Sequence, residues 1–277
     1  MSKFLSSVAI TEFDSMVKQA YQGMGLIKPC VTVRNNVTGD TYNFRRMQKG
    51  IANQKSTADL VTPMDIQHEF KIATLANWNA PEYTDIFDQA EVNFDEKQEL
   101  AEAVAGAIGR REDQIIIDSL DASTPLTTAI PAGAANLTVA KCISAQVGLR
   151  DQGVPNSDLC AVIEAFGLGG LLNDEKATSS DFQMVKALVQ GDINSAFGFK
   201  FLIIETRAEG GLSEAASVVD SWFFHKAASG IAIGIDMKTS IDWIADRTAW
   251  LTNGIFKAGA VVRDEGGLIK VQYLKTA

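Results

Sequence analysis

One long predicted helix is the feature that most constrains how this chain of 277 residues can fold. From Asn93 to Ala122 apolar residues recur at helical spacing, and Asn93 is a suitable N-terminal cap. The predicted buried face holds Leu100, Val104, Ile108, Ile115, Ile116 and Leu120. At a rise of 1.5 Å per residue, about 27 helical residues form a rod of roughly 40 Å, more than twice the average for globular proteins. Any fold for this chain must accommodate that rod.

The charges of the chain are divided between two neighbouring segments. The chain as a whole carries −9, yet between Lys28 and Lys55 six basic residues face only Asp40, which gives +5. Between Glu82 and Asp121 twelve acidic residues face three basic ones, which gives −9. The acidic balance disfavours a general nucleic-acid binder, although a basic edge strand that is simply solvated remains an alternative for the first segment. Opposite charges of this size predict a contact, which we place between copies of the chain.

Composition and cysteine usage are those of a folded protein without disulfides or a membrane anchor. Hydrophobic residues make up 46% and charged residues 21%, and no uncharged apolar run is long enough to span a membrane. Cys30, Cys142 and Cys160 are odd in number and lack CxxC spacing. We therefore expect three free thiols in a reducing compartment.

The rest of the pattern predicts an α+β fold with mostly antiparallel pairing. A helix is predicted over Ile10–Met24, and Val31–Asn36 with Thr41–Met47 is predicted to form a β-hairpin. The polar stretch Gln48–Thr62 cannot bury itself, which is typical of a segment that is disordered or docked on something else. Further helices are expected over 138–151 and 166–172, and extended runs over 159–163, 199–205, 221–225, 231–235, 240–244, 256–262 and 268–274.

No catalytic, cofactor-binding or metal-binding constellation is found in the sequence. The glycine-rich run 161–170 lacks the G-x-G-x-x-G spacing of a phosphate loop and predicts a tight turn from strand to helix. His68 and His225 lie in no ligand cluster and are interpreted as structural. Adjacent acids such as Glu112 and Asp113 could bind Mg²⁺, but a solvated or subunit-facing surface is the more common role for an acidic helix.

Several segments together resemble the major capsid proteins of tailed bacteriophages, particularly those of short-tailed phages. The resemblance covers nearly the whole chain and is carried by 59–68, 89–92, 99–101, 107–110, 113–118, 221–228 and 233–239. It implies the Hong Kong 97-like capsid fold. The implied division is an N-terminal arm over 1–27, an extended loop over 28–72, a peripheral domain over 73–134 with its spine helix over 93–122, an axial domain over 135–236, peripheral-domain strands over 237–254, and C-terminal strands over 255–277 that return to the axial domain.

The resemblance also implies self-assembly into hexamers and pentamers of an icosahedral shell that encloses double-stranded DNA. In such shells the extended loop reaches the neighbouring subunit near its spine helix. This arrangement would place the basic segment of one copy against the acidic segment of the next. The expected contact residues are Arg34, Phe44, Arg45, Arg46, Met47, Lys49 and Lys55 on the loop, and Asp95, Glu96, Glu99 and Glu102 on the helix. Some family members join loops covalently through lysine and asparagine, but nothing around Lys49, Lys55 or Asn253 supports this, and we expect a non-covalent joint.

The expected partners are other copies of the chain, a separate scaffolding protein, a portal and a decoration protein. The DNA would be enclosed without sequence-specific binding, and no membrane is involved. We expect a structural protein without enzymatic activity, made in the host bacterial cytoplasm and located in the virion capsid. Two alternatives are an encapsulin-like nanocompartment shell and, with less support, a Mg²⁺-dependent hydrolase.

Overall fold

The computed structural model describes residues 25–85, 96–174, 195–205, 207 and 209–275, and the side chains of 96–99 are not described. Within these ranges the chain forms helices and strands in mostly antiparallel sheets, which confirms the α+β prediction. The predicted helix over Ile10–Met24 lies outside the described residues. No helix in the described ranges is both long enough and apolar enough to cross a membrane.

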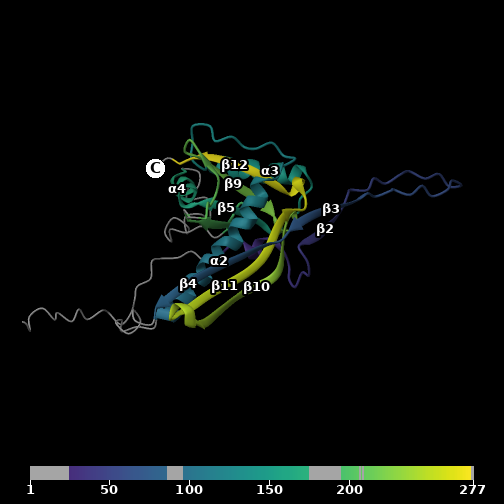
Figure 1. Ribbon diagram of the computed structural model, residues 1–277. Coiled ribbons are helices and arrows are strands. Elements are labelled where there is room, and N and C mark those ends of the chain that lie inside the picture. The colour runs from purple at the N-terminus through teal and green to yellow at the C-terminus, as the bar shows by residue number, and fades with distance from the viewer. Residues whose placement is uncertain (1–24, 86–95, 175–194, 206, 208, 276–277) are drawn as a thin grey trace, which may run out of the picture.

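The long helix α2 (Glu96–Asp121) confirms the rod predicted from the sequence. It lies along a sheet whose strand order is β1-β10-β11-β4, and Figure 1 shows it running beside β4 and β11. Val104 and Ile108 of α2 are buried at this contact. They approach the sheet so closely at Gly254 that a Cβ atom there would overlap both side chains. This sheet comprises β1 (Thr32–Arg34), β4 (Ala76–Asp85), β10 (Ser229–Ile244) and β11 (Ala249–Val262).

The predicted hairpin between Val31–Asn36 and Thr41–Met47 is wrong. β1 instead pairs in parallel with β10, whereas β2 (Thr41–Met47) pairs with β3 (His68–Thr74), a strand that the sequence analysis did not identify. Asn36 and Gly39 both have positive φ, so the chain turns between β1 and β2 towards different partners. The true hairpin therefore closes across residues 48–67, a connection too long for local sequence to predict.

A second sheet and two helices form the other part of the core. Its strand order is β12-β9-β5-β7-β6, and β8 pairs with β9. Every residue of β5 is buried, and α4 starts directly after it, which confirms the predicted turn from strand to helix. The elements are α3 (Val139–Asp151), α4 (Ala165–Asn173), β5 (Leu159–Glu164), β6 (Ser195–Ala196), β7 (Phe199–Ile204), β8 (Glu214–Ala215), β9 (Val218–His225) and β12 (Leu268–Leu274).

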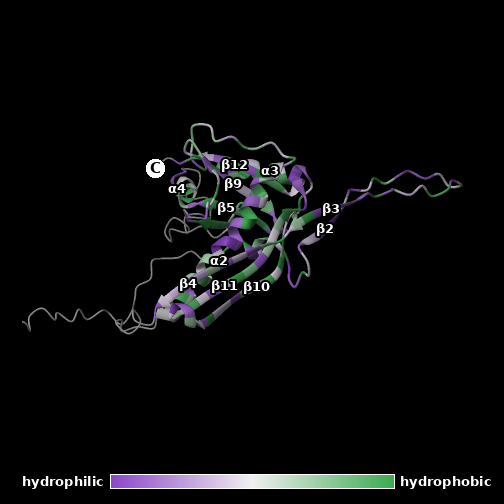
Figure 2. Ribbon diagram, viewed as in Figure 1, coloured by the Kyte–Doolittle hydropathy of each residue, from purple (hydrophilic) through white to green (hydrophobic). Residues whose placement is uncertain are grey.

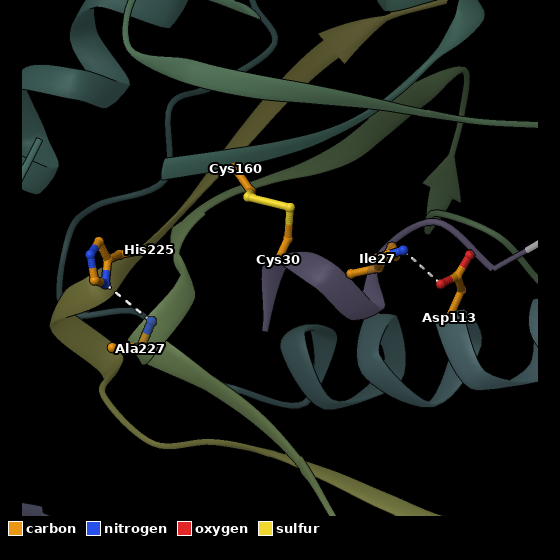
Figure 3. The surroundings of a disulfide bond; sticks show 6 residues. All are labelled: Ile27, Cys30, Asp113, Cys160, His225 and Ala227. Carbon is orange, nitrogen blue, oxygen red and sulfur yellow. Dashed lines mark hydrogen bonds between the residues drawn. A yellow bond between two sulfur atoms is a disulfide. The ribbon is translucent and has the colours of Figure 1, made fainter. Parts of the chain in front are cut away.

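The prediction of three free thiols is wrong, because Cys30 and Cys160 form a disulfide (Figure 3). Their Cα atoms lie 6.1 Å apart although 130 positions separate them in the sequence. The short helix that contains Cys30 lies against β5, a neighbourhood that cysteine spacing does not reveal. Cys142 is free, and burial raises the pKa of its thiol to about 12, which makes it an unreactive core residue.

Candidate inter-subunit contact site

The hairpin of β2 and β3 carries a long loop that projects far from the rest of the molecule (Figure 1). Beyond Met47 and His68 the loop has little backbone bonding, with one bond from the Gln48 N–H to the Gln67 carbonyl and one turn from Asp59 to Ser56. Figure 2 shows hydrophobic and hydrophilic residues alternating along it. Among its apolar side chains Ile51 is 79% exposed, Leu60 93% and Val61 78%.

These exposed apolar residues belong to the candidate contact surface, and the sequence analysis did not name them. The sequence indicates a polar stretch over Gln48–Thr62 because polar residues follow one another there and apolar residues are few. Solvent exposure of Ile51, Leu60, Val61 and the half-exposed Met64 on one projecting loop is unusual, since contiguous exposed apolar groups mark interaction surfaces. The sequence contains these apolar residues, but only the structure shows that the loop projects and that the core does not cover their side chains.

The charge of the loop is smaller than the sequence segment suggested. Because β2 pairs with β3, the projecting unit spans residues 41–74, where five basic residues face three acidic ones, a net charge of +2. The outer part, 48–67, holds two lysines and two aspartates and is neutral. The positive charge therefore lies near the base of the hairpin, and the outer part offers mainly apolar surface.

The base of the hairpin is held to its own chain by ion pairs and a small apolar cluster. Arg46 lies 2.8 Å from Asp264, and Lys71 lies 2.8 Å from Glu265. Asp40 accepts a hydrogen bond from Lys257, which lowers the pKa of the Asp40 carboxyl group. These contacts fix the direction in which the loop projects, because they tie both strands to the end of β11 and the turn that follows it.

The predicted loop residues fall into two groups in the structure. Phe44, expected at the contact between copies, is only 4% exposed and packs with Ala73, Leu75 and Ala232 of its own chain. Alternation along β2 turns Phe44 inward, so it offers almost no surface to a neighbour. Arg46 pairs with Asp264 at the base of the hairpin, as described above. The residues exposed on their elements are Arg34, Arg45, Met47, Lys49 and Lys55.

Two of these exposed residues also touch their own chain. The Lys49 ammonium group donates a hydrogen bond of 2.6 Å to the Gln152 carbonyl. The Arg45 guanidinium lies 5.7 Å from the centre of the Phe70 ring, near the outer limit for a cation–π contact. Both interactions are exposed and weak enough to be exchanged for a partner.

The helix side of the predicted contact is described only in part. Asp95 lies outside the described residues, and Glu96 and Glu99 belong to the first turn of α2, where side chains are not described. Glu102 lies on the exposed side of the helix. The structure therefore places one of the four predicted acids directly on an accessible surface.

Most acids of the second half of α2 bind groups of their own chain. Glu112 lies 3.0 Å from Lys28, so one of the six basic residues of the first segment already pairs with one of the twelve acids of the second. Burial raises the pKa of the Glu112 carboxyl group, while Lys28 opposes that shift. Asp121 accepts a hydrogen bond of 2.6 Å from the Trp222 indole. Part of the charge division is thus neutralised inside each copy.

Asp113 is the most enclosed of these acids. Its side chain is fully buried and lies 3.0 Å from Arg207. It also accepts hydrogen bonds from the backbone N–H groups of Leu26 and Ile27, the latter drawn in Figure 3. Asp113 therefore joins three segments: the described start of the chain, the long helix, and the segment after β7.

The histidines and acidic pairs support no catalytic or metal site in the described part of the chain. The Nδ1 atom of His225 accepts a hydrogen bond from the Ala227 N–H and caps a short helix (Figure 3), the structural role predicted for it. Across the described ranges, no group of three or more metal-ligating side chains gathers. The pair Glu112 and Asp113 therefore has no third ligand there.

Comparisons with known proteins agree on one family. Residues 5–275 match the family described as phage capsid protein. No curated protein matches the chain by sequence. Among solved structures, the head of Helicobacter pylori bacteriophage KHP40 superposes with a TM-score of 0.76 at 11% identity, covering 96% of this chain and 96% of that one.

Two further solved structures show the same fold. The capsid of the cyanophage P-SCSP1u gives a TM-score of 0.74 at 15% identity, with 98% of this chain and 94% of that chain covered. Mycobacterium phage Che8 gives 0.72 at 17% identity, with 94% and 95% covered. These matches confirm the Hong Kong 97-like fold, whereas the implied domain boundaries remain a prediction. Neither the nanocompartment nor the hydrolase alternative is supported.

The family match spans almost the entire chain, and it agrees with the fold found independently from the coordinates. The match also accounts for the missing catalytic constellation, because the family is structural rather than enzymatic. The chain belongs to the phage capsid protein family, and it is a major capsid protein that assembles with its own copies into the shell of the virion.

Proposed function

We propose that each copy is joined to the next by its projecting loop, which lies on the neighbour near the exposed acidic side of α2. The single observation that carries this proposal is the exposure of Leu60, at 93%, on a loop that contacts no core among the described residues. On the loop, Arg45, Met47, Lys49 and Lys55 would face Glu102 and the acids of the first turn of the helix, whereas the predicted contact residue Arg34 lies on β1, outside the projecting unit.

Apolar contact contributes more to this joint than charge. Complete burial of a leucine or valine side chain is worth about 1.5–3 kcal/mol, whereas an exposed ion pair is worth about 0–1 kcal/mol. Ile51, Leu60 and Val61 therefore supply most of the affinity. The basic residues near the hairpin base would mainly orient the approaching copies and speed their association.

The wider assembly follows from the same proposal. Hexamers and pentamers would form an icosahedral shell around double-stranded DNA, with a separate scaffolding protein, a portal and a decoration protein as partners. The support for these is the capsid family and the resemblance of the chain to tailed-phage capsid proteins. The net charge of −9 favours enclosure of DNA without tight binding, since the packaged phosphates and the shell are of like sign.

Replacing Leu60 with aspartate is expected to reduce the yield of assembled particles at least tenfold. The variant loses a buried leucine at every joint, about 2 kcal/mol each, while its own chain loses no packing. Particle yield is measured by gradient sedimentation and electron microscopy of the full-length protein expressed with its assembly partners. Thermal unfolding of the unassembled chain should be unchanged.

Thr57→Asp is the matched control, because it adds the same charge to the same loop at a polar, exposed position. It should assemble like the parent protein. Particles formed by Leu60→Asp at the parental yield would contradict the proposed joint.

Reversing Arg45 and Lys55 to glutamate is expected to slow assembly about fivefold at low salt, with little effect at 1 M salt. Exposed charges act over a screening length of about 10 Å at 0.1 M salt, which shrinks to about 3 Å at 1 M. Light scattering during assembly at several salt concentrations measures the effect. Arg46 is left unchanged, since its pairing with Asp264 would confuse loss of folding with loss of contact. Equal rates for parent and variant at low salt would show that these charges do not orient the copies.

A further inference from the structure

The strand β10 has an open edge along its second half. β1 covers only Gly230–Ala232, and the Val37 N–H binds the Ile233 carbonyl. Beyond Ile233, no described strand lies on that side of β10, although the other side stays paired with β11 as far as Ile244. In Figure 1 this part of β10 forms the border of the sheet, on the side away from β4.

The side chains on this edge are those of an interface rather than of a protected border. All residues from Ile235 to Trp243 are exposed. Natural edge strands are usually short, or carry prolines and charges that prevent pairing with another strand. Here the edge is long and contains no proline. Its charges, Asp236, Lys238 and Asp242, are of both signs, and the large apolar side chains of Ile235, Met237, Ile241 and Trp243 are 41–47% exposed.

We propose that two copies of the chain pair along this edge, antiparallel, across a two-fold axis at Ser240. The inference rests on the proposed assembly of copies into a shell, and it adds a second joint distinct from the projecting loop. In an antiparallel pair, two directly opposed residues either both form backbone hydrogen bonds to each other or both do not, and the two kinds alternate along a strand. A two-fold axis between identical strands must therefore pass through a residue, which then lies opposite its own copy. An axis at Ser240 places Lys238 opposite Asp242 twice, once on each side of the axis.

Neighbouring registers are disfavoured by the charges. An axis at Thr239 would place Asp236 opposite Asp242, and an axis at Lys238 would place that lysine opposite its own copy. An axis at Ile241 would place Lys238 opposite Ile244 and Asp242 opposite Ser240, so neither charge would face an opposite charge. Like charges directly opposed across strands are destabilising, whereas opposite charges and large apolar pairs each add up to about 1 kcal/mol. Among these registers, only the axis at Ser240 places Lys238 and Asp242 opposite each other, and it leaves Asp236 opposite Ile244 rather than opposite a like charge.

The apolar residues fit the same register. Thr239 would face Ile241 on each side of the axis, and Met237, which lies in the bulge next to the regular strand, would come near Trp243 of the other copy. Trp243 already contacts Trp250 of its own chain, with ring centres 5.3 Å apart, so an indole surface is held in place for a partner. Contacts of methionine sulfur with aromatic rings are favourable. A bulge between Ile235 and Lys238 marks the other limit of the regular strand.

Replacement of Ser240 with cysteine tests the register directly. In purified particles of the full-length protein, mild oxidation should link Ser240→Cys chains into disulfide dimers at least tenfold more than Thr239→Cys chains. Opposed residues have Cβ atoms about 4.5–5.5 Å apart, close to disulfide range, whereas the two copies of residue 239 would be separated by about 8 Å. The native thiols do not interfere, because Cys142 is buried and the other two are paired.

A charge exchange provides the second measurement, in the Ser240→Cys background. Lys238→Asp and Asp242→Lys should each lower the dimer yield roughly tenfold, because each variant opposes like charges twice. The double variant restores both opposite pairs and should regain most of the yield. If the edge of β10 were simply solvated, the double variant would not regain the dimer yield that the single variants lose.

The outcomes separate this inference from the proposed joint through the loop. Particles that form normally but yield no Ser240→Cys dimer would overturn the edge pairing alone, including the case in which residues 1–24 or a neighbouring loop cover β10. Preferential dimers of Thr239→Cys would overturn the register. Failure of the parent protein to form particles at all would instead count against the proposed function.

Discussion

Reduction of the Cys30–Cys160 disulfide is expected to lower the free energy of unfolding by about 4 kcal/mol. A cross-link destabilises the unfolded chain by restricting it, and this effect increases with the length of the closed loop. Here 130 positions separate the two cysteines, so nearly half of the chain is enclosed. The bond also joins the described start of the chain to β5, a strand whose residues are all buried.

Urea unfolding of the full-length, unassembled protein with and without a thiol reductant measures the loss. The double variant Cys30→Ala with Cys160→Ala should resemble the reduced protein and should not respond to reductant. Because this double variant keeps Cys142 and lacks the cross-link, it is also the control for effects of the reductant elsewhere. A parent protein with the same midpoint in both conditions would show that the cross-link adds no stability.

Replacing Asp113 with alanine is expected to cost about 3 kcal/mol of unfolding free energy. The carboxylate is fully buried against Arg207, whose side chain is also inaccessible, and it binds the N–H groups of Leu26 and Ile27. Removing one member of a buried pair typically costs about 3–5 kcal/mol, because the other charge stays behind without compensation. The lower end of that range applies here, since Arg207 retains a hydrogen bond of 3.2 Å to Glu205.

Asp118→Ala is the matched control on the same helix. Asp118 is exposed, and its carboxylate accepts one described hydrogen bond, from the Gln114 side-chain amide, so the expected loss is below about 1 kcal/mol. Thermal and urea unfolding of the two variants should differ clearly. If Asp113→Ala unfolds at the same urea concentration as Asp118→Ala, the junction at Asp113 does not hold the start of the chain to α2.

The sequence predicted correctly those helices and strands whose formation depends on neighbouring residues. The boundaries of α2, Glu96–Asp121, lie inside the predicted range 93–122, because helical periodicity is a property of neighbouring residues; the predicted cap, Asn93, lies outside the described residues. The buried strand β5 and the turn into α4 were predicted for the same reason. β4 was missed because Pro81 and several polar residues make it look like a loop, and such sequences are tolerated on the edge of a sheet.

The contact between copies stays a prediction, and the structure changes the balance of forces expected for it. The charge division is real in the sequence, yet Lys28 pairs with Glu112 and Arg46 with Asp264 inside one copy. Phe44, expected at the contact, is buried in its own chain, while Leu60 was not expected there and is almost fully exposed. Counting charges along the chain cannot distinguish a partner in the same copy from one in the next.

The amino-acid sequence by itself determined the long helix, the α+β class and the family resemblance, because each depends on residues close in the chain or on the overall order of segments. Only the tertiary structure decided which strands pair, that Cys30 meets Cys160, and how much of the acidic helix is neutralised within its own copy. These features depend on contacts between residues far apart in sequence. Such contacts form where the packed core brings surfaces together, and no local pattern records that geometry.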